Sequence, residues 1–184
     1  MAFEGFTNQE RAIGLLKAEL ESGWVPHAHL FVGPGGVGRR DLARRMAAIL
    51  LCQEHESDQC DNCKSCHAFS TGNHPDYFEI GVPDGRQSLP ISSIRGGDSG
   101  GSRGLQEEAS LKPVLSGRRV FVVRDAERMT VEAANCFLKT LEEPPGESYF
   151  ILIASGLQEI PDTIISRCRL IKMSGLPVRN VAAT

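Results

Sequence analysis

A glycine-rich segment between an apolar strand and a helix constrains the fold of this chain more than any other feature. Ala28 to Val32 is a short apolar run, and Gly33-Pro-Gly-Gly-Val-Gly38 follows it directly. Arg39 to Leu51 then contains good helix formers with apolar residues at helical spacing. A strand that passes through a glycine loop into a helix begins a parallel βαβ unit, so the sequence predicts a parallel sheet covered by helices.

The rest of the chain repeats this alternation. Further strands are predicted at Tyr77–Ile80, Arg119–Val123, Tyr149–Ala154 and Leu170–Met173. Helices are predicted over 8–22, Leu105–Leu111, Thr130–Glu142 and Pro161–Ser166. Residues 81–103 are rich in glycine, serine, proline and aspartate and are predicted to be loop, with a flexible insertion at Gly96–Gly104. The pattern predicts a three-layer α/β fold with a mostly parallel five-stranded sheet.

Four of the six cysteines lie within fifteen residues: Cys52, Cys60, Cys63 and Cys66. The N-terminus shows no apolar stretch typical of a signal peptide, so we expect a reducing, cytoplasmic location, where clustered cysteines indicate metal rather than disulfides. Four thiolates fill a tetrahedral coordination sphere, which favours a structural zinc site over a catalytic one.

Other residues near the cysteines or of the same type are assigned no metal role. His55 and His67 lie close enough to replace one cysteine, but we expect them to be bystanders. Cys136 and Cys168 stand in apolar contexts and are predicted to be small core residues.

The glycine loop matches a phosphate-binding pattern only in part. In G-x-x-x-x-G-K-[ST], backbone N–H groups cradle phosphates, the lysine reaches the outer phosphates and the hydroxyl binds Mg²⁺. Arg39 and Arg40 occupy the lysine and hydroxyl positions. Arg39 still offers a cation to a phosphate, whereas Arg40 has no oxygen for Mg²⁺ and its charge opposes the ion. The loop is therefore interpreted as a degraded phosphate site, in which the binding of ATP or ADP is left open, formed by Gly33, Gly35, Gly36, Gly38 and Arg39.

A carboxylate is also missing at the end of a buried strand. Sites of this kind hold Mg²⁺ from the other side with an aspartate at that position. The strand at 119–123 ends in Arg124-Asp125, so Arg124 stands at the aspartate position. Asp125 is either a catalytic carboxylate or an ordinary turn residue, and the sequence does not choose. With three ligands replaced, we interpret the chain as a nucleotide-hydrolase scaffold that does not itself hydrolyse nucleotide.

Several motifs follow one another along the chain: His27-Ala-His-Leu-Phe-Val-Gly-Pro34, the four-cysteine insertion, His74-Pro-Asp76, Leu138-Lys-Thr-Leu-Glu-Glu-Pro-Pro145 and Ser166-Arg-Cys168. They occur in the same order in bacterial DNA polymerase III clamp-loader subunits, which this chain resembles. Over residues 7–174 the chain resembles the N-terminal AAA+ domain of the delta-prime and gamma/tau subunits of this family. The resemblance implies a P-loop NTPase fold within an assembly that opens a ring-shaped sliding clamp and places it on primed DNA.

The resemblance also assigns roles to single residues. In this family the gamma/tau subunits hydrolyse ATP, whereas delta-prime has a degraded site, and the missing ligands match delta-prime. Arg167 is implied to be an arginine finger that reaches the ATP site of a neighbouring subunit; without the resemblance, a surface ion pair is the simpler interpretation. Ser155 stands where active relatives place a polar sensor of the γ-phosphate. The implied partners are gamma/tau, delta, the sliding clamp and primed DNA.

The resemblance divides the chain into one domain and the start of a linker. Residues 1–174 are expected to form the nucleotide-binding-like domain, with the zinc module of residues 52–66 inserted. Residues 175–184 are expected to begin a linker to lid and collar regions that lie outside this chain.

Two other functions remain as alternatives. An active ATPase of the gamma/tau type would use Arg39 in place of lysine and Asp125 as its catalytic carboxylate. A zinc-dependent nucleic-acid-binding module is disfavoured, because Lys64 is the one basic residue among four acidic ones in 52–66 and the whole chain carries a net charge of −3. Membrane insertion is not expected, because the longest apolar run has seven residues.

Overall fold

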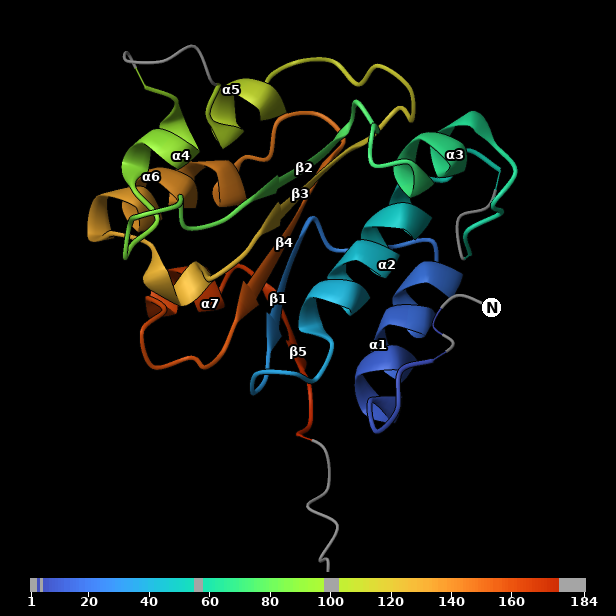
Figure 1. Ribbon diagram of the computed structural model, residues 1–184, viewed down its shortest axis with the longest axis horizontal. Helices are drawn as coiled ribbons and strands as arrows, with labels where there is room; N and C mark the ends of the chain where they lie inside the picture. The colour runs from blue at the N-terminus through green and yellow to red at the C-terminus, as the bar shows by residue number, and fades with distance from the viewer. Residues whose placement is uncertain (1–2, 4, 55–57, 98–102, 176–184) are drawn as a thin grey trace, which may run out of the picture.

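The computed structural model describes residues 3, 5–54, 58–97 and 103–175, and its five strands form one fully parallel sheet (Figure 1). The strands are β1 (Ala28–Val32), β2 (Tyr77–Ile80), β3 (Arg119–Val123), β4 (Ser148–Ala154) and β5 (Arg169–Lys172). Their order across the sheet is β2-β3-β4-β1-β5, so β1 lies between β4 and β5. The predicted parallel sheet is confirmed.

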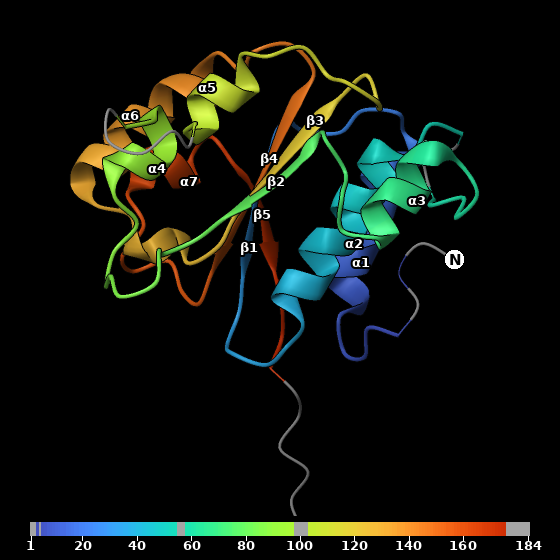
Figure 2. The ribbon, with the colours of Figure 1, turned by 45° about the horizontal axis from the view of Figure 1, so that its top comes forward.

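Helices cover both faces of the sheet, as Figures 1 and 2 show. One layer contains α1 (Glu10–Glu21), α2 (Arg39–Leu51) and α3 (Lys64–Ser70). The other contains α4 (Ile91–Arg95), α5 (Leu105–Ala109), α6 (Val131–Glu142) and α7 (Asp162–Ile165), with the 3-10 turn η1 (Ala126–Arg128) after β3. Alternate residues of one strand enter opposite cores: Ile151 packs under α1 and α2, whereas Leu152 packs under α6. The three-layer prediction is confirmed.

The structure differs from the sequence prediction mainly in short helices. The helix α4 occurs where loop was expected, and α3 was not predicted, because five and seven residues are too few for a periodic pattern to be recognised. The predicted cap of α6 is confirmed, since the Thr130 hydroxyl accepts the Ala133 N–H at 3.2 Å. Of the predicted insertion, 98–102 lie outside the described residues, as do His55 and 176–184 of the expected linker.

The two isolated cysteines are only partly buried. Cys168 packs against the core beside α6, where burial raises the pKa of its thiol to about 12. Cys136 packs against the same core but also donates its S–H to the side-chain oxygen of Gln106. None of the helices in the described part of the chain is both long and apolar enough to cross a lipid bilayer.

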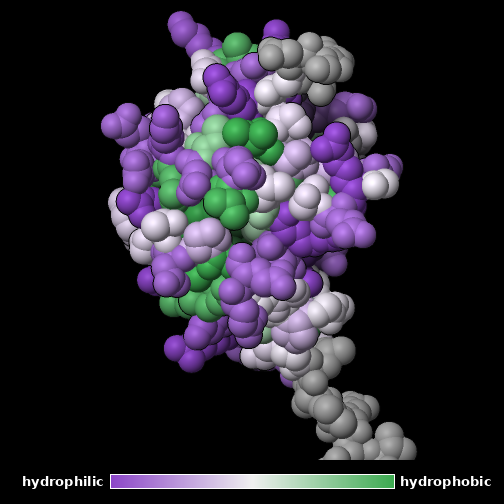
Figure 3. Space-filling view, turned by 90° about the vertical axis from the view of Figure 1, so that its left-hand side faces the viewer, coloured by the Kyte–Doolittle hydropathy of each residue, from purple (hydrophilic) through white to green (hydrophobic). Residues whose placement is uncertain are grey.

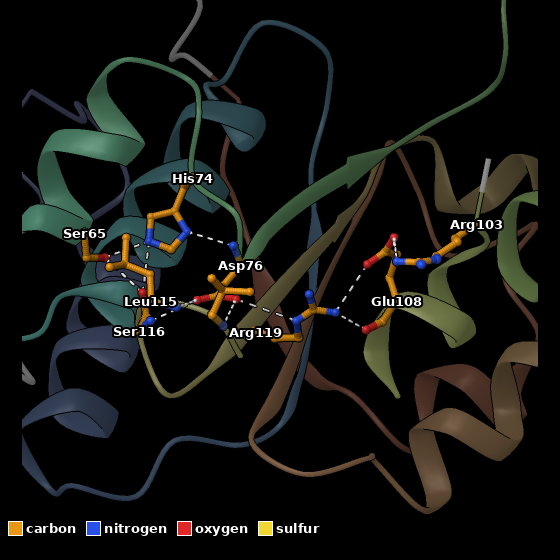
Figure 4. Close-up of polar contacts among 9 residues, drawn as sticks. Ser65, His74, Asp76, Arg103, Glu108, Leu115, Ser116 and Arg119 are labelled. Carbon is orange, nitrogen blue, oxygen red and sulfur yellow. Dashed lines mark hydrogen bonds and ion pairs between the residues drawn. The ribbon is translucent and has the colours of Figure 1, made fainter. Parts of the chain in front are cut away.

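A buried polar network fastens the cysteine-containing insertion to the sheet (Figure 4). Asp76, just before β2, has no exposed surface. Its carboxylate accepts hydrogen bonds from the backbone N–H groups of Val114, Leu115 and Ser116, and the Arg119 guanidinium lies 3.7 Å away. Burial opposes ionisation, but these donors outweigh it, so the pKa of Asp76 lies below its ordinary value.

His74 extends the network to the insertion. Its Nδ1 accepts the Asp76 N–H at 3.0 Å, so Nε2 carries the proton in the neutral ring. That Nε2–H lies 2.8 Å from the Ser65 hydroxyl and 2.9 Å from the Ser116 hydroxyl. Ser65 donates in turn to the carbonyl of Leu51, the residue before Cys52. The network therefore joins α2 and α3 to the segment before β3.

Replacing Asp76 by asparagine is expected to destabilise the full-length protein by about 3 kcal/mol at neutral pH, because backbone donors and the buried Arg119 lose their anion. A carboxylate with a lowered folded pKa contributes stability above its unfolded pKa, about 4, and loses it as the pH falls through the folded pKa. The difference between wild type and variant should therefore shrink below about pH 4. Urea unfolding across pH measures this, with the exposed Asp84→Asn as the matched control; a pH-independent difference would contradict the assignment.

Candidate functional site: a cysteine cluster and a closed phosphate loop

The four clustered cysteines converge as predicted. Their sulfur atoms all lie within 4.8 Å of one another, and the Sγ atoms of Cys60 and Cys66 are 3.8 Å apart. A tetrahedron with Zn–S bonds of about 2.3 Å has edges of about 3.8 Å, so the sulfur positions fit one zinc ion. His67 is exposed on α3 and is not part of the cluster. Backbone N–H groups that donate hydrogen bonds to these sulfurs also favour the thiolate form, which binds a cation.

Backbone donors face the sulfurs of this cluster. The Cys63 N–H lies 3.3 Å from Cys60 Sγ, and the Cys66 N–H lies 3.3 Å from Cys63 Sγ, which caps α3. Burial opposes ionisation of Cys63, but N–H groups of Gln53 and Cys66 outweigh it and lower its pKa to about 7. Burial and the neighbouring thiols raise the pKa of Cys66. A donor set of four thiols, at least one of them easily ionised, is the chemistry of a structural zinc site.

The glycine loop has the shape of a phosphate loop. It connects β1 to α2, and Gly36 and Gly38 have φ values of +78° and +81°, which side-chain-bearing residues rarely adopt. Gly38 caps α2, so the free N–H groups of the first helical turn point into the loop. The loop borders a cleft of about 320 Å³ lined by Gly36, Gly38, Arg39, Arg40, Asp41, Arg124, Asp125, Glu127 and Ile153.

The two arginines that replace magnesium ligands are bound to one carboxylate. Glu79 Oε1, on β2, lies 2.7 Å from Arg40 Nε and 3.0 Å from Arg124 Nε. Arg44 lies 3.5 Å from its other oxygen, and the Tyr77 hydroxyl donates to that oxygen at 2.8 Å. Burial opposes ionisation of Glu79, but Tyr77 and the arginines outweigh it and lower its pKa. An anionic carboxylate thus joins the start of α2 to the ends of β2 and β3.

Three further carboxylates shape the cleft. Asp41 is in the first turn of α2, where its negative charge interacts with the positive end of the helix dipole, which would otherwise attract a phosphate. Glu127 accepts hydrogen bonds from both the backbone N–H and the hydroxyl of Ser155, so the expected sensor residue is already engaged within the chain. Asp125 has a left-handed φ of +53° and starts η1, as a turn residue does. This geometry leaves both interpretations of its carboxylate open.

Arg167 lies away from the glycine loop, directly after α7. Its Nη1 donates to the Thr163 carbonyl at 2.9 Å, and its Nη2 lies 2.5 Å from Glu142 Oε1 at the end of α6. About a third of its side chain is exposed. The ion pair that the sequence offered as the simpler interpretation is therefore present, and the guanidinium still reaches solvent.

Sequence reasoning did not identify Glu79 or Glu127. Neither residue belongs to the phosphate-binding pattern, and both act through strands or turns distant in the sequence from their partners. The one available signal for Glu79 is its place at the third residue of a four-residue apolar strand, where a lone carboxylate needs a partner.

We expect one zinc ion per chain in the full-length protein, measured by elemental analysis of material purified without chelator. Cys63→Ser should reduce bound zinc below half an ion per chain and lower the melting temperature, because structural zinc binding is coupled to folding. Cys136→Ser, outside the cluster, is the control and should retain the metal. Less than half an equivalent of zinc in the wild type would contradict a four-cysteine site.

Comparison with known proteins agrees with this architecture. The family model described as "DNA polymerase III, delta subunit" matches residues 8–177. DNA polymerase III subunit delta' of Bacillus subtilis is 35% identical over 168 residues, covering 91% of this chain and 48% of that protein. The Escherichia coli subunit delta' is 33% identical, covering 84% and 44%. The chain thus spans about half the length of these relatives.

Solved structures show the same fold at low sequence identity. A DNA polymerase III gamma subunit-related protein of Thermotoga maritima superposes with a TM-score of 0.57 at 20% identity, covering 91% of this chain and 47% of that one. The RuvB Holliday junction branch migration motor of the same organism gives 0.57 at 15% identity, covering 90% and 45%. The expected AAA+ fold is therefore confirmed, and the family match over residues 8–177 shows that the chain belongs to the DNA polymerase III delta-subunit family.

Proposed function

We propose that the chain is the nucleotide-binding-like region of a DNA polymerase III clamp-loader subunit that does not hydrolyse ATP and supplies Arg167 to a neighbouring subunit. The observation that carries the proposal is the replacement of magnesium ligands by Arg40 and Arg124, both bound to Glu79. A site that opposes Mg²⁺ with two cations cannot use the metal to neutralise a transferring phosphoryl group. The chain then acts on ATP hydrolysis by another subunit.

Membership of the family suggests the domain organisation and the partners of the full-length protein. Residues 1–174 form the nucleotide-binding-like domain, the inserted module at 52–66 binds a structural zinc, and 175–184 begin the linker. The partners are the gamma/tau and delta subunits, with the sliding clamp and primed DNA reached through the assembly in the cytoplasm. The relatives at 35% and 33% identity support this choice because both are named DNA polymerase III subunit delta'.

The surface near α6 supports association with another protein. Figure 3 shows hydrophobic side chains gathered on the side of the molecule where α4 and α6 lie. Ile91 of α4 is 38% exposed and Val131 of α6 is 71% exposed. Apolar side chains gathered on one side of a molecule are typical of interaction sites. Arg167 follows α7, which packs against α6, so its guanidinium belongs to the same layer of the molecule.

An active ATPase of the gamma/tau type is the second candidate. It is favoured by the 30% identity to DNA polymerase III subunit tau of Bacillus subtilis over 168 residues. In it, Arg39 would contact the outer phosphates and Asp125 would activate water. The presence of Arg40 and Arg124 at the positions of magnesium ligands argues against an active ATPase.

Steady-state ATP hydrolysis separates the two candidates. We expect the purified full-length protein alone to show no Mg²⁺-dependent turnover above buffer, because no described residue of the cleft supplies a metal ligand at the hydroxyl or aspartate position. Asp125→Asn should therefore change nothing in this assay. Turnover that requires Mg²⁺ and is abolished by Asp125→Asn would instead support the active ATPase.

The role of Arg167 is tested in a reconstituted clamp loader. Removal of one preorganised donor costs about 100-fold or more at the site that it serves. Arg167→Ala in the full-length subunit should therefore remove the contribution of that site to clamp-stimulated ATP turnover. Arg11→Ala, an exposed arginine on α1 in the opposite helix layer, is the control and should leave turnover unchanged. Equal turnover with Arg167→Ala and wild type would refute the arginine finger.

A further inference from the structure

The end of α6 holds the Arg167 guanidinium from one side. Glu142 is the last residue of α6, and its Oε1 lies 2.5 Å from Arg167 Nη2. The neighbouring Leu141 is buried in the core beside the sheet. Its carbonyl, left free at the helix end, accepts a hydrogen bond from His27 Nε2 at 2.9 Å. The backbone that carries Glu142 is therefore fixed both by packing and by a hydrogen bond from the segment that leads into β1.

The end of α7 holds the same guanidinium from another side. Arg167 Nη1 donates to the Thr163 carbonyl at 2.9 Å, in the last turn of α7, where free carbonyls attract a cation. Two terminal nitrogens are thus bound to two different helices. Because a guanidinium is planar and rigid, two such contacts fix its plane as well as its position. Nη1 also lies 3.4 Å from the Ser166 hydroxyl, and the exposed third of the side chain leaves part of the guanidinium open to a further anion.

This ion pair is too exposed to serve mainly as a source of stability. The exposed fractions of the Arg167 and Glu142 side chains are 36% and 49%, and pairs of this kind contribute little to folding. Its larger effect is to restrict the conformations of the Arg167 side chain, since an arginine side chain without a partner samples many rotamers. A group that acts on a reacting phosphoryl must be held near its working position, because a displacement of about 1 Å can cost about 100-fold in rate.

We propose that Glu142 is a positioning residue for Arg167, holding the guanidinium at the point from which it reaches the nucleotide of a neighbouring subunit. The inference rests on the proposed function of Arg167 and adds a residue that acts through it. Glu142 does not touch the nucleotide. Its carboxylate accepts a hydrogen bond from Nη2, while Nη1 donates to the Thr163 carbonyl and about a third of the Arg167 side chain stays exposed to solvent.

The experiment uses the full-length subunit in a reconstituted clamp loader, with clamp and primed DNA at saturation and ATP varied. Glu142→Ala removes both the charge and the acceptor, whereas Glu142→Gln keeps a carbonyl acceptor. Glu143→Ala is the matched control, because it makes the same charge change one residue later without removing a contact to Arg167. Melting temperatures within about 2 °C of wild type are expected, because an exposed pair contributes little to folding.

We expect Glu142→Ala to lower the Arg167-dependent part of kcat by about tenfold with KM for ATP unchanged, because positioning acts on the transition state and not on nucleotide binding. Glu142→Gln should keep more activity than Glu142→Ala, and Glu143→Ala should match wild type. The double variant Arg167→Ala/Glu142→Ala should be no slower than Arg167→Ala alone, because Glu142 acts only through Arg167.

The other possible outcomes contradict the positioning role of Glu142. Wild-type or raised kcat in both Glu142 variants overturns the inference, since the carboxylate is then idle or competes with the phosphate for Arg167. Equal loss in Glu142→Ala and Glu143→Ala, or additive loss in the double variant, overturns it as well. If Arg167→Ala itself leaves turnover unchanged, the arginine finger fails, and the positioning role fails with it.

Discussion

The parallel sheet, buried on both faces, is the constraint from which the other features follow. Because all five strands run in the same direction, the loops after β1, β3 and β4 emerge at one edge. That edge brings the glycine loop, Arg124 and Ile153 to one cleft although 86 residues separate Gly38 from Arg124 in the sequence. Phe121 and Phe150 of the sheet stack on each other, and Phe137 of α6 packs edge-on against Phe150, so these buried rings fix α6 on the sheet.

The cleft retains the backbone of a nucleotide site but has a different charge distribution. Glycines still shape the loop, and α2 still begins at its end. However, Arg40 and Arg124 stand where the sequence pattern has magnesium ligands, and both form ion pairs with Glu79 of strand β2. These ion pairs join α2 to the sheet through side chains of the chain itself.

The cysteine insertion and the Arg167 region use the same principle at two other places. In each, polar contacts join a short segment to residues that are distant in the sequence. Ser65, His74 and Asp76 connect the insertion to the strands, and the Glu142 carboxylate and Thr163 carbonyl hold Arg167. His74 is buried and its pKa is lowered by burial, although the Asp76 charge partly opposes this, so its neutral ring serves as a fixed donor and acceptor.

The sequence by itself determined the strand and helix alternation, the four-cysteine cluster and the loss of metal ligands at Arg40 and Arg124, because each is a local pattern of residue types at fixed spacing. The cap of α6 by Thr130 is predictable for the same reason. Only the tertiary structure decided the partners of those residues. Glu79, Glu127 and Glu142 are ordinary carboxylates in the sequence, and their significance comes from contacts with residues 25 to 45 positions away, which depend on strand order and helix packing. A side chain's partner in such cases is set by the shape of the fold, which no local spacing encodes.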